Sequence, residues 1–426
     1  MASTLTRDYA TFISDCPTSF HAAAEMARRL DGAGYVRQDE REAWAGERRG
    51  YLVRGGAVIA WHVGKVIPQT GFRIVGSHTD SPSFKVKPTP DSGAHGFGQV
   101  NVEVYGGPLL NSWLNRDLGL AGVVTDLDGR AHLVRTPAIM AIPQLAPHLD
   151  RSVNDRLELS RQTDYKPIWS LGQADLLGYV CELAGVELGR AAAFDLFAYD
   201  TQEPAVYGGL TGEDFFASGR QDNLSSVFTS LTAFLAPETE AAVDNGNDVA
   251  IFVAFDHEEV GSSTYSGAAG AFLETALRRI CAHLPLDADP DERFARMIAN
   301  SSCISADAGH SVNPNKANLH DPDHHPVLGA GPLLKVNANQ RYASEAYGSA
   351  LWLRSAAAGG VATQQFVSNN DVPCGSTIGP LTATRLGILT VDVGIPLLSM
   401  HSVREVSAPA DLEAMTIILG EYFAGA

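Results

Sequence analysis

The spacing of hydrophobic residues changes along the chain and predicts where its helices and strands lie. Apolar residues recur at helical spacing from Thr4 to Leu30, with a break at Pro17. Glycine-punctuated apolar runs follow, and beyond residue 219 strand-like runs alternate with amphipathic helical runs. The expected strands are 50–53, 57–62, 72–75, 248–255, 302–305, 388–393 and 397–400, and the expected later helices are 225–235, 267–284, 291–299, 344–358 and 410–422.

Strands that alternate with helices of this length predict an α/β fold, with a mostly parallel sheet flanked by helices. The middle of the chain has a different texture. Short alternating runs such as 100–105 and 123–125 are separated there by Gly, Pro and Asn turns, which is typical of an antiparallel β-rich domain. We therefore expect a discontinuous α/β domain made of residues 1–83 and 219–426, and an inserted β-rich domain made of residues 84–218.

Composition narrows the class of protein. The 426 residues include 31 Lys and Arg against 49 Asp and Glu, a formal charge of −18 that argues against a nucleic-acid partner. The five cysteines are scattered and form no CxxC pair, which indicates reduced thiols rather than disulfides or a cysteine zinc site. No signal-peptide segment and no apolar run of about 20 residues is present, so we expect a cytoplasmic protein without a membrane partner.

Four of the predicted strands are followed directly by histidines or carboxylates. In open α/β sheets the functional crevice lies beyond the carboxyl ends of the strands, so these side chains are expected to meet at one edge. An aspartate just before the helix at 225–235 can face the same crevice. The residues concerned are His78 and Asp80 in VGSHTDSP, Asp222 in SGRQDNLSS, Glu258 and Glu259 in FDHEEVGS, Asp307 in SADAGH and His401 in SMHSVRE.

Taken singly, each of these residues has an ordinary role, as a helix cap or a hydrogen-bonded histidine. Taken together, two histidines and several carboxylates suit zinc or a similar divalent ion. A shared carboxylate can bridge two ions, and a spare carboxylate beside a ligand is a natural general base. Adjacent Glu258 and Glu259 also repel each other unless positive charge compensates them. The pattern favours a two-metal hydrolase.

Other candidate sites are weaker. The loop HDPDHHP offers three histidines and two aspartates, but a polar loop with two prolines is more often a solvated turn. No GxSxG motif is present, and Cys374 has no base nearby in the sequence, so serine or cysteine nucleophilic catalysis is disfavoured.

Seven motifs in this order resemble the aspartyl aminopeptidase family of dizinc metallopeptidases, and they span most of the chain. They are GSHTDSP, SGRQDNL, DHEEVGS, SADAGH, KVNANQRYA, DVPCGSTIG and SMHSVRE. The resemblance implies a catalytic domain that is split by a dimerisation domain, two divalent ions per subunit (most simply Zn²⁺), and peptide substrates. It also implies a homo-oligomer built from dimers, commonly a tetrahedral dodecamer.

The resemblance also implies a role for each matching residue. His78 and Asp307 would hold one ion and Glu259 and His401 the other, with Asp222 bridging both. Glu258 would be the general base, and Asp80 would orient His78. The residues that would contact substrate are Lys335, Tyr342, His310 and, from a neighbouring subunit, His148.

One position departs from the family pattern. The family has a second histidine before Pro-Asn, and this chain has Asn313, which cannot become cationic. We expect an aminopeptidase that prefers amino-terminal Asp or Glu, although Asn313 weakens that preference. The alternatives are another dizinc amidohydrolase, such as a deacylase or carboxypeptidase, and a self-assembling scaffold with residual metal binding.

Overall fold

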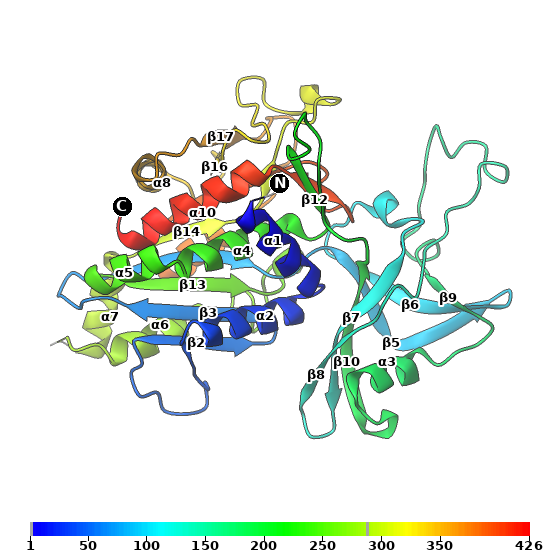
Figure 1. The fold of residues 1–426 in the computed structure, drawn as a ribbon, viewed down its shortest axis with the longest axis horizontal. Coiled ribbons are helices and arrows are strands. Elements are labelled where there is room, and N and C mark those ends of the chain that lie inside the picture. Colours follow the sequence, from blue (N-terminus) through cyan, green and yellow to red (C-terminus); the bar gives the residue numbers. More distant parts are fainter. Residues whose placement is uncertain (1–2, 287–288) are drawn as a thin grey trace.

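The computed structural model describes residues 3–286 and 289–426, and within them two separate sheets dominate (Figure 1). The larger sheet has nine strands. Their order is β1 (Val36–Arg37), β2 (Arg49–Arg54), β3 (Ala57–Val63), β13 (Val249–Phe255), β4 (Phe72–His78), β14 (Ser302–Ala306), β18 (Leu389–Gly394), β16 (Leu333–Val336) and β17 (Gln364–Val367).

The centre of this sheet is parallel. Strands β13, β4, β14 and β18 run in one direction, while β2, β3 and β16 pair antiparallel with neighbours. Side chains of β13 alternate between two hydrophobic cores, with Phe252 in one and Ile251 and Val253 in the other. A strand covered on both faces is apolar throughout, which explains the continuous hydrophobic run in the sequence. The predicted α/β class with a mostly parallel sheet is confirmed.

Helices cover both faces of the large sheet (Figure 1). The predicted break at Pro17 separates the first two helices. One face carries α1 (Thr4–Asp15), α2 (Ser19–Gly32), α4 (Gln221–Phe234), α5 (Pro237–Asn245), α8 (Ala346–Ala358) and α10 (Pro409–Ala424), and the other carries α6 (Phe272–Ala282), α7 (Pro290–Ala299) and α9 (Ile378–Leu386).

The second sheet is antiparallel and has its own hydrophobic core around Phe84, Trp113 and Tyr165. Helix α3 (Leu176–Ala184) packs on it. Its strand order is β8 (Ala131–Arg135), β7 (Leu118–Asp126), β10 (Ala191–Asp200), β5 (Ser83–Ala94), β6 (Phe97–Tyr105) and β9 (Ile168–Leu171).

A small third sheet joins distant parts of the chain. Strand β11 (Ala205–Tyr207) pairs with β12 (Phe215–Ser218), and β12 pairs with β20 (Glu405–Ser407) near the C-terminus rather than with the second sheet. This pairing brings the segment before Asp222 next to the segment after His401.

Two predicted elements are wrong in extent. The helix expected at 267–284 begins only at Phe272, because the chain turns tightly before it: a Cβ on Gly267 would lie 2.2 Å from the Ser262 carbonyl oxygen. The strand expected at 397–400 is only β19 (Pro396–Leu397), which pairs with β15 (Gly309–His310). Positive φ angles of 56° at Ser399 and 67° at His401 then reverse the chain. The other predicted elements occur with ends shifted by a few residues.

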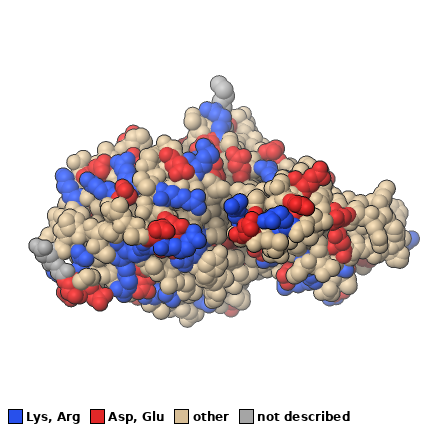
Figure 2. Space-filling model, turned by 90° about the horizontal axis from the view of Figure 1, so that it is seen from below, with Lys and Arg blue, Asp and Glu red and all other residues tan. Residues whose placement is uncertain are grey.

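The structure also describes the cysteines, the apolarity of the helices and the surface charge. All five cysteines are free. None of the helices in the described part of the chain has the length and apolarity that crossing a bilayer requires. On the face in Figure 2, basic and acidic side chains are interspersed over both halves of the molecule.

Candidate metal centre

The carboxyl ends of three parallel strands meet at one point of the large sheet. His78 is the last residue of β4 and pairs in register with Phe255 at the end of β13. Asp307 follows β14, whose pairing with β4 holds it beside them. Asp222 and His401 approach the same point from the segments that β12 and β20 join. The structure thus brings His78, Asp80, Asp222, Glu258, Glu259, Asp307 and His401 into one cluster.

The Asp80 carboxylate fixes the turn that carries the two glutamates. It accepts hydrogen bonds from the backbone N–H groups of Glu258 (3.0 Å) and Glu259 (3.1 Å). The turn starts with His257 at a φ of 64° and ends with Gly261 at 94°. These bonds hold the two adjacent carboxylates at the end of β13.

Glu405 joins the two segments on the opposite side. Its carboxylate accepts hydrogen bonds from the backbone N–H groups of His401 (2.7 Å) and Asp222 (3.0 Å). Burial and the negative charge of Asp222 raise the pKa of Glu405 to about 8. Glu405 therefore sets the distance between two of the clustered side chains.

Each clustered histidine has one ring nitrogen fixed by a carbonyl oxygen. His78 Nδ1 donates to the Asp80 carbonyl (3.1 Å), and His401 Nδ1 donates to the Gly107 carbonyl (2.9 Å). Because a carbonyl oxygen can only accept, the hydrogen is on Nδ1 in both rings. Both Nε2 atoms are thereby directed at the carboxylates, the arrangement that orients metal-ligating histidines.

Asp222 lies between the two imidazole rings. Its Oδ1 is 3.5 Å from His78 Nε2, and its Oδ2 is 3.2 Å from His401 Nε2. A second carboxylate accompanies each histidine: Asp307 Oδ1 is 3.6 Å from His78 Nε2, and Glu259 Oε1 is 3.7 Å from His401 Nε2. The cluster is therefore two histidine–carboxylate pairs with one carboxylate shared between them.

The electrostatics of the cluster favour a cation. Although burial opposes it, the carboxylates of Asp222 and Glu259 raise the pKa of His401 to about 10. Burial and the charge of Asp222 raise the pKa of the Glu259 carboxyl well above its usual range. Both raised pKa values reflect an excess of buried negative charge, which a metal ion would neutralise as a proton does.

Two oxygens of the cluster also lack partners. Asp222 Oδ1 and Glu259 Oε1 are buried and accept no hydrogen bond from any described residue. Such atoms are uncommon in proteins and cost about 1–3 kcal/mol each unless an ion or water binds them. One donor atom from each of His78, Asp222 and Glu259 lies within 4.8 Å of the others. Nitrogen and carboxylate oxygen are zinc ligands, so these residues fit a divalent ion.

Glu258 is a member of the cluster that belongs to neither histidine–carboxylate pair. Burial raises the pKa of its carboxyl to about 7; the charge of His78 opposes this rise, and the Asp307 and Asp222 carboxylates add to it. A carboxyl with a pKa near neutrality can both take up and release a proton at physiological pH.

Three of the four expected substrate residues, Lys335, His310 and Tyr342, lie near the cluster, and Lys335 is buried rather than on the surface. Its Nζ donates to the Ala308 carbonyl (2.8 Å) and lies 5.3 Å from the centre of the Tyr342 ring. His310 and Tyr342 line one cavity together with Phe366 and Cys374.

Asn313, the residue that departs from the family pattern, has a local structural role. The Asn313 side chain accepts a hydrogen bond from the Asn315 N–H (3.0 Å), and the Asn313 N–H donates to His320 Nε2 (3.1 Å). His320 comes from the HDPDHHP loop and lines the same cavity as His310. The loop does not gather a second group of metal-binding side chains among the described residues.

His148 is exposed in a turn of the inserted segment. Within the described chain it forms no hydrogen bond or ion pair with the cluster. The segment around it, teal in Figure 1, lies on the part of the second sheet remote from the large one.

Sequence reasoning missed two residues that hold the cluster, Glu405 and Tyr105. Glu405 stands four residues after His401, inside the quoted motif SMHSVRE, so its position was a usable signal. Tyr105 ends an ordinary alternating run, and its hydroxyl donates to Asp80 Oδ2 (2.8 Å). Nothing in its local sequence marks it.

Known proteins resemble this chain over almost its whole length. The family model described as aminopeptidase I zinc metalloprotease (M18) matches residues 12–423. A probable M18 family aminopeptidase 2 from Streptomyces avermitilis is 45% identical over 417 residues, which cover 95% of this chain and 94% of the relative. The Ape4 chain solved in complex with Nbr1 superposes with a TM-score of 0.92 at 32% identity and covers 99% of this chain and 85% of its own. The S. cerevisiae mApe1 dodecamer gives a TM-score of 0.86 at 27% identity, with coverage of 99% and 97%.

The shared carboxylate leads to a prediction about metal content. Asp222→Ala removes the one side chain that faces both histidines, so the protein should lose bound zinc on dialysis. The loss of affinity should exceed the about 10- to 100-fold typical of removing a partner outside the ligand set. Elemental analysis after dialysis measures it. Asp321→Ala, in the HDPDHHP loop, is the control and should retain the wild-type zinc content. A normal zinc content in Asp222→Ala would exclude Asp222 from the site.

Proposed function

The chain belongs to the aminopeptidase I zinc metalloprotease (M18) family and is a zinc-dependent aminopeptidase. From this premise we propose that it works with two metal ions and that Glu258 is the general base. We also propose that it prefers peptides with amino-terminal Asp or Glu. The observation that carries the proposal is the position of Asp222. Each of its oxygens faces one histidine, and each histidine has a further carboxylate of its own.

The proposed ligand sets follow from these pairs. His78 and Asp307 would hold one ion, Glu259 and His401 the other, and Asp222 both. When bound, such ions act as Lewis acids and lower the pKa of water enough for attack on a carbonyl at neutral pH. The protein's own part is to hold the Nδ1 hydrogens on the Asp80 and Gly107 carbonyls, so that Nε2 is the nitrogen each ring presents to an ion.

Glu258 would move the proton. It would take one proton from the attacking water and deliver it to the leaving amine, a transfer for which a pKa of about 7 is well placed. Asp80 supports this role through the backbone, because its carboxylate holds the Glu258 N–H.

The acidic preference would rest on Lys335. This lysine is buried, and among the described residues no carboxylate forms an ion pair with it; its one polar contact there is the Ala308 carbonyl. A buried ammonium without a counter-ion favours an anionic ligand. Tyr342 and His310 would line the same binding region.

Assembly completes the proposal. We propose that residues 84–218 form a dimerisation domain on a catalytic domain of residues 1–83 and 219–426, and that dimers build a dodecamer in the cytoplasm. Supporting observations are the dodecameric S. cerevisiae neighbour and the apolar edge of the second sheet, where Leu171 is 86% exposed and Phe97 42%. In such an assembly His148 would reach the active site of a neighbouring subunit.

The general base gives the first activity prediction. Glu258→Gln keeps the size of the side chain but removes its capacity to accept a proton, so turnover of a peptide with a free amino terminus should fall by about 10²- to 10⁴-fold. Zinc content should stay at the wild-type value. Glu413→Gln, on an exposed position of α10, is the matched control. Near-wild-type turnover in Glu258→Gln with zinc retained would refute the assignment.

Specificity gives a second prediction. Lys335→Met keeps the length of the buried side chain and removes its charge, so cleavage of amino-terminal Asp and Glu should fall by about 10- to 100-fold. Cleavage of Leu and Ala should change far less. Steady-state kinetics on matched aminoacyl substrates measures the ratio, with Lys65→Met on an exposed loop as control. Equal losses on all four substrates would contradict the proposal, as would a wild-type preference for Leu.

The shared active site gives a third prediction. His148→Ala and Glu258→Gln should each be nearly inactive alone. After subunit exchange of a 1:1 mixture, half of the dimers are mixed and each contains one intact site, so about a quarter of wild-type activity should return. Native mass spectrometry verifies the exchange. Verified exchange without recovered activity would mean that His148 does not act across the subunit boundary.

A further inference from the structure

The end of strand β6 in the second sheet is in direct contact with the metal centre of the first. The chain leaves β6 at Tyr105 and passes through Gly106 and Gly107 before it reaches Leu109. Each of these four residues lies against Asp80, Glu259 or His401. The second sheet therefore does more than extend the molecule, because part of it belongs to the wall of the site.

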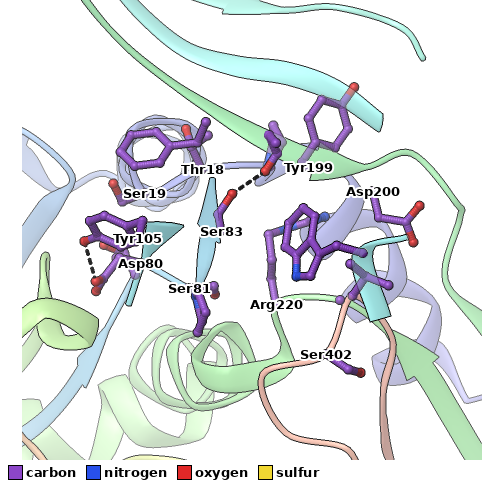
Figure 3. A pocket seen from close by; sticks show the side chains of 18 of the residues that line it. Thr18, Ser19, Asp80, Ser81, Ser83, Tyr105, Tyr199, Asp200, Arg220 and Ser402 are labelled. Carbon is purple, nitrogen blue, oxygen red and sulfur yellow. Dashed lines mark hydrogen bonds between the residues drawn. The ribbon is translucent and has the colours of Figure 1, made fainter. Parts of the chain in front are cut away.

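Tyr105 makes the most specific of these contacts. Its hydroxyl donates to Asp80 Oδ2 at 2.8 Å, and the pocket between the two sheets in Figure 3 shows the hydroxyl directed at that carboxylate. Burial and the neighbouring Asp80 charge raise the pKa of Tyr105, so the hydroxyl keeps its proton and remains a donor. The ring is held in place by an edge contact with Phe197, with ring centres 5.2 Å apart.

Asp80 connects Tyr105 to the site by hydrogen bonds. The same Oδ2 atom that accepts the Tyr105 hydroxyl also accepts the Glu259 N–H (3.1 Å), and Oδ1 accepts the Glu258 N–H (3.0 Å). Asp80 Oδ1 also lies 3.4 Å from His78 Nδ1. A rotation of the Asp80 carboxylate would therefore move the proposed ligand Glu259 and weaken the contact that orients the proposed ligand His78.

The two glycines after Tyr105 bring the backbone close to the other half of the site. Gly106 has a φ of 70°, and a Cβ there would lie 3.0 Å from the Glu259 Cβ. The Gly107 carbonyl accepts from His401 Nδ1, and the Leu109 N–H donates to the His401 carbonyl (2.8 Å). These contacts fix the distance between the end of β6 and the site, which in turn places the Tyr105 hydroxyl at Asp80.

We propose that Tyr105 is a positioning residue of the zinc site: its hydroxyl fixes the Asp80 carboxylate, and through Asp80 it couples the second sheet to the affinity for metal. This inference rests on the proposed function, since it assumes that His78 and Glu259 are ligands. It assigns no role in catalysis to Tyr105 itself, which touches none of the reacting groups.

The test compares zinc release from two Tyr→Phe variants of the zinc-loaded protein. Tyr105→Phe keeps the ring and removes only the donor, so zinc should transfer to a chromogenic chelator with an affinity loss of about 10- to 100-fold, the range for partners outside the ligand set. Tyr165→Phe is the control: Tyr165 lies in the turn before β9 and is buried in the core of the same sheet, and its hydroxyl has no hydrogen-bond partner among the described residues. It should release zinc as wild type does.

A double-mutant cycle separates positioning from a general effect on the fold. Asp80→Asn should itself weaken zinc binding, and adding Tyr105→Phe should then cost almost nothing further, because the two changes act on one interaction. Additive losses would mean that Tyr105 acts by another route and would overturn the inference. So would wild-type zinc affinity in Tyr105→Phe.

Failure of the inference is distinguishable from failure of the proposed function. A wild-type protein that binds no zinc would remove the metal site itself and both proposals with it. A wild-type protein that binds two zinc ions, together with a Tyr105→Phe variant that holds them equally well, would overturn only the coupling.

Discussion

Buried negative charge is the constraint on which the rest of the structure depends. Asp80, Asp222, Asp307 and Glu405 are all buried at one edge of the large sheet, next to the partly covered Glu258 and Glu259. Isolated carboxylates in such a place would cost several kcal/mol each. The chain offsets this cost with backbone N–H donors to Asp80 and Glu405 and with two imidazoles. The buried negative charge that stays uncompensated, at Asp222 and Glu259, is what a bound cation would neutralise.

The sequence was sufficient to predict those features of the fold and site that depend on local pattern. Continuous apolar runs marked β13 and β4, because strands covered on both faces need apolar side chains throughout. Since parallel strands share one carboxyl edge, the residues after them can be grouped from the sequence alone. His78, Glu259 and Asp307 were found in this way, and the register of β4 with β13 explains why the grouping holds.

Features that depend on pairing between segments far apart in the sequence cannot be predicted from local pattern. Glu405 accepts a hydrogen bond from the Asp222 N–H, 183 residues earlier in the chain, and only the pairing of β12 with β20 brings the two together. The turn at His401 has a left-handed backbone, which no hydrophobic pattern predicts. Hydrogen bonds from His401 to the Glu405 carboxylate and to the Gly107 carbonyl stabilise it. The tight turn before α6 escapes the hydrophobic pattern for a local reason: Gly267 is required because the Ser262 carbonyl leaves no room for a Cβ.

The way the second sheet is inserted explains why the site needs it. The chain enters that sheet at Ser83, three residues after Asp80. It leaves the sheet at Asp200, the end of β10, and reaches Asp222 through β11 and β12 of the third sheet. Both connections therefore join the sheet to a member of the cluster, and the Ser81 hydroxyl donates to the Asp222 carbonyl at 2.6 Å to tie them together. Where the chain enters the second sheet, a displacement of that sheet cannot be absorbed in a flexible linker, because only Ser81 and Pro82 lie between Asp80 and β5. It must instead be resisted by contacts at the junction, and the Tyr105 hydroxyl at Asp80 and the Gly107 carbonyl at His401 provide them. An insertion at this place is compatible with a precise metal site only if the inserted sheet also helps to build that site.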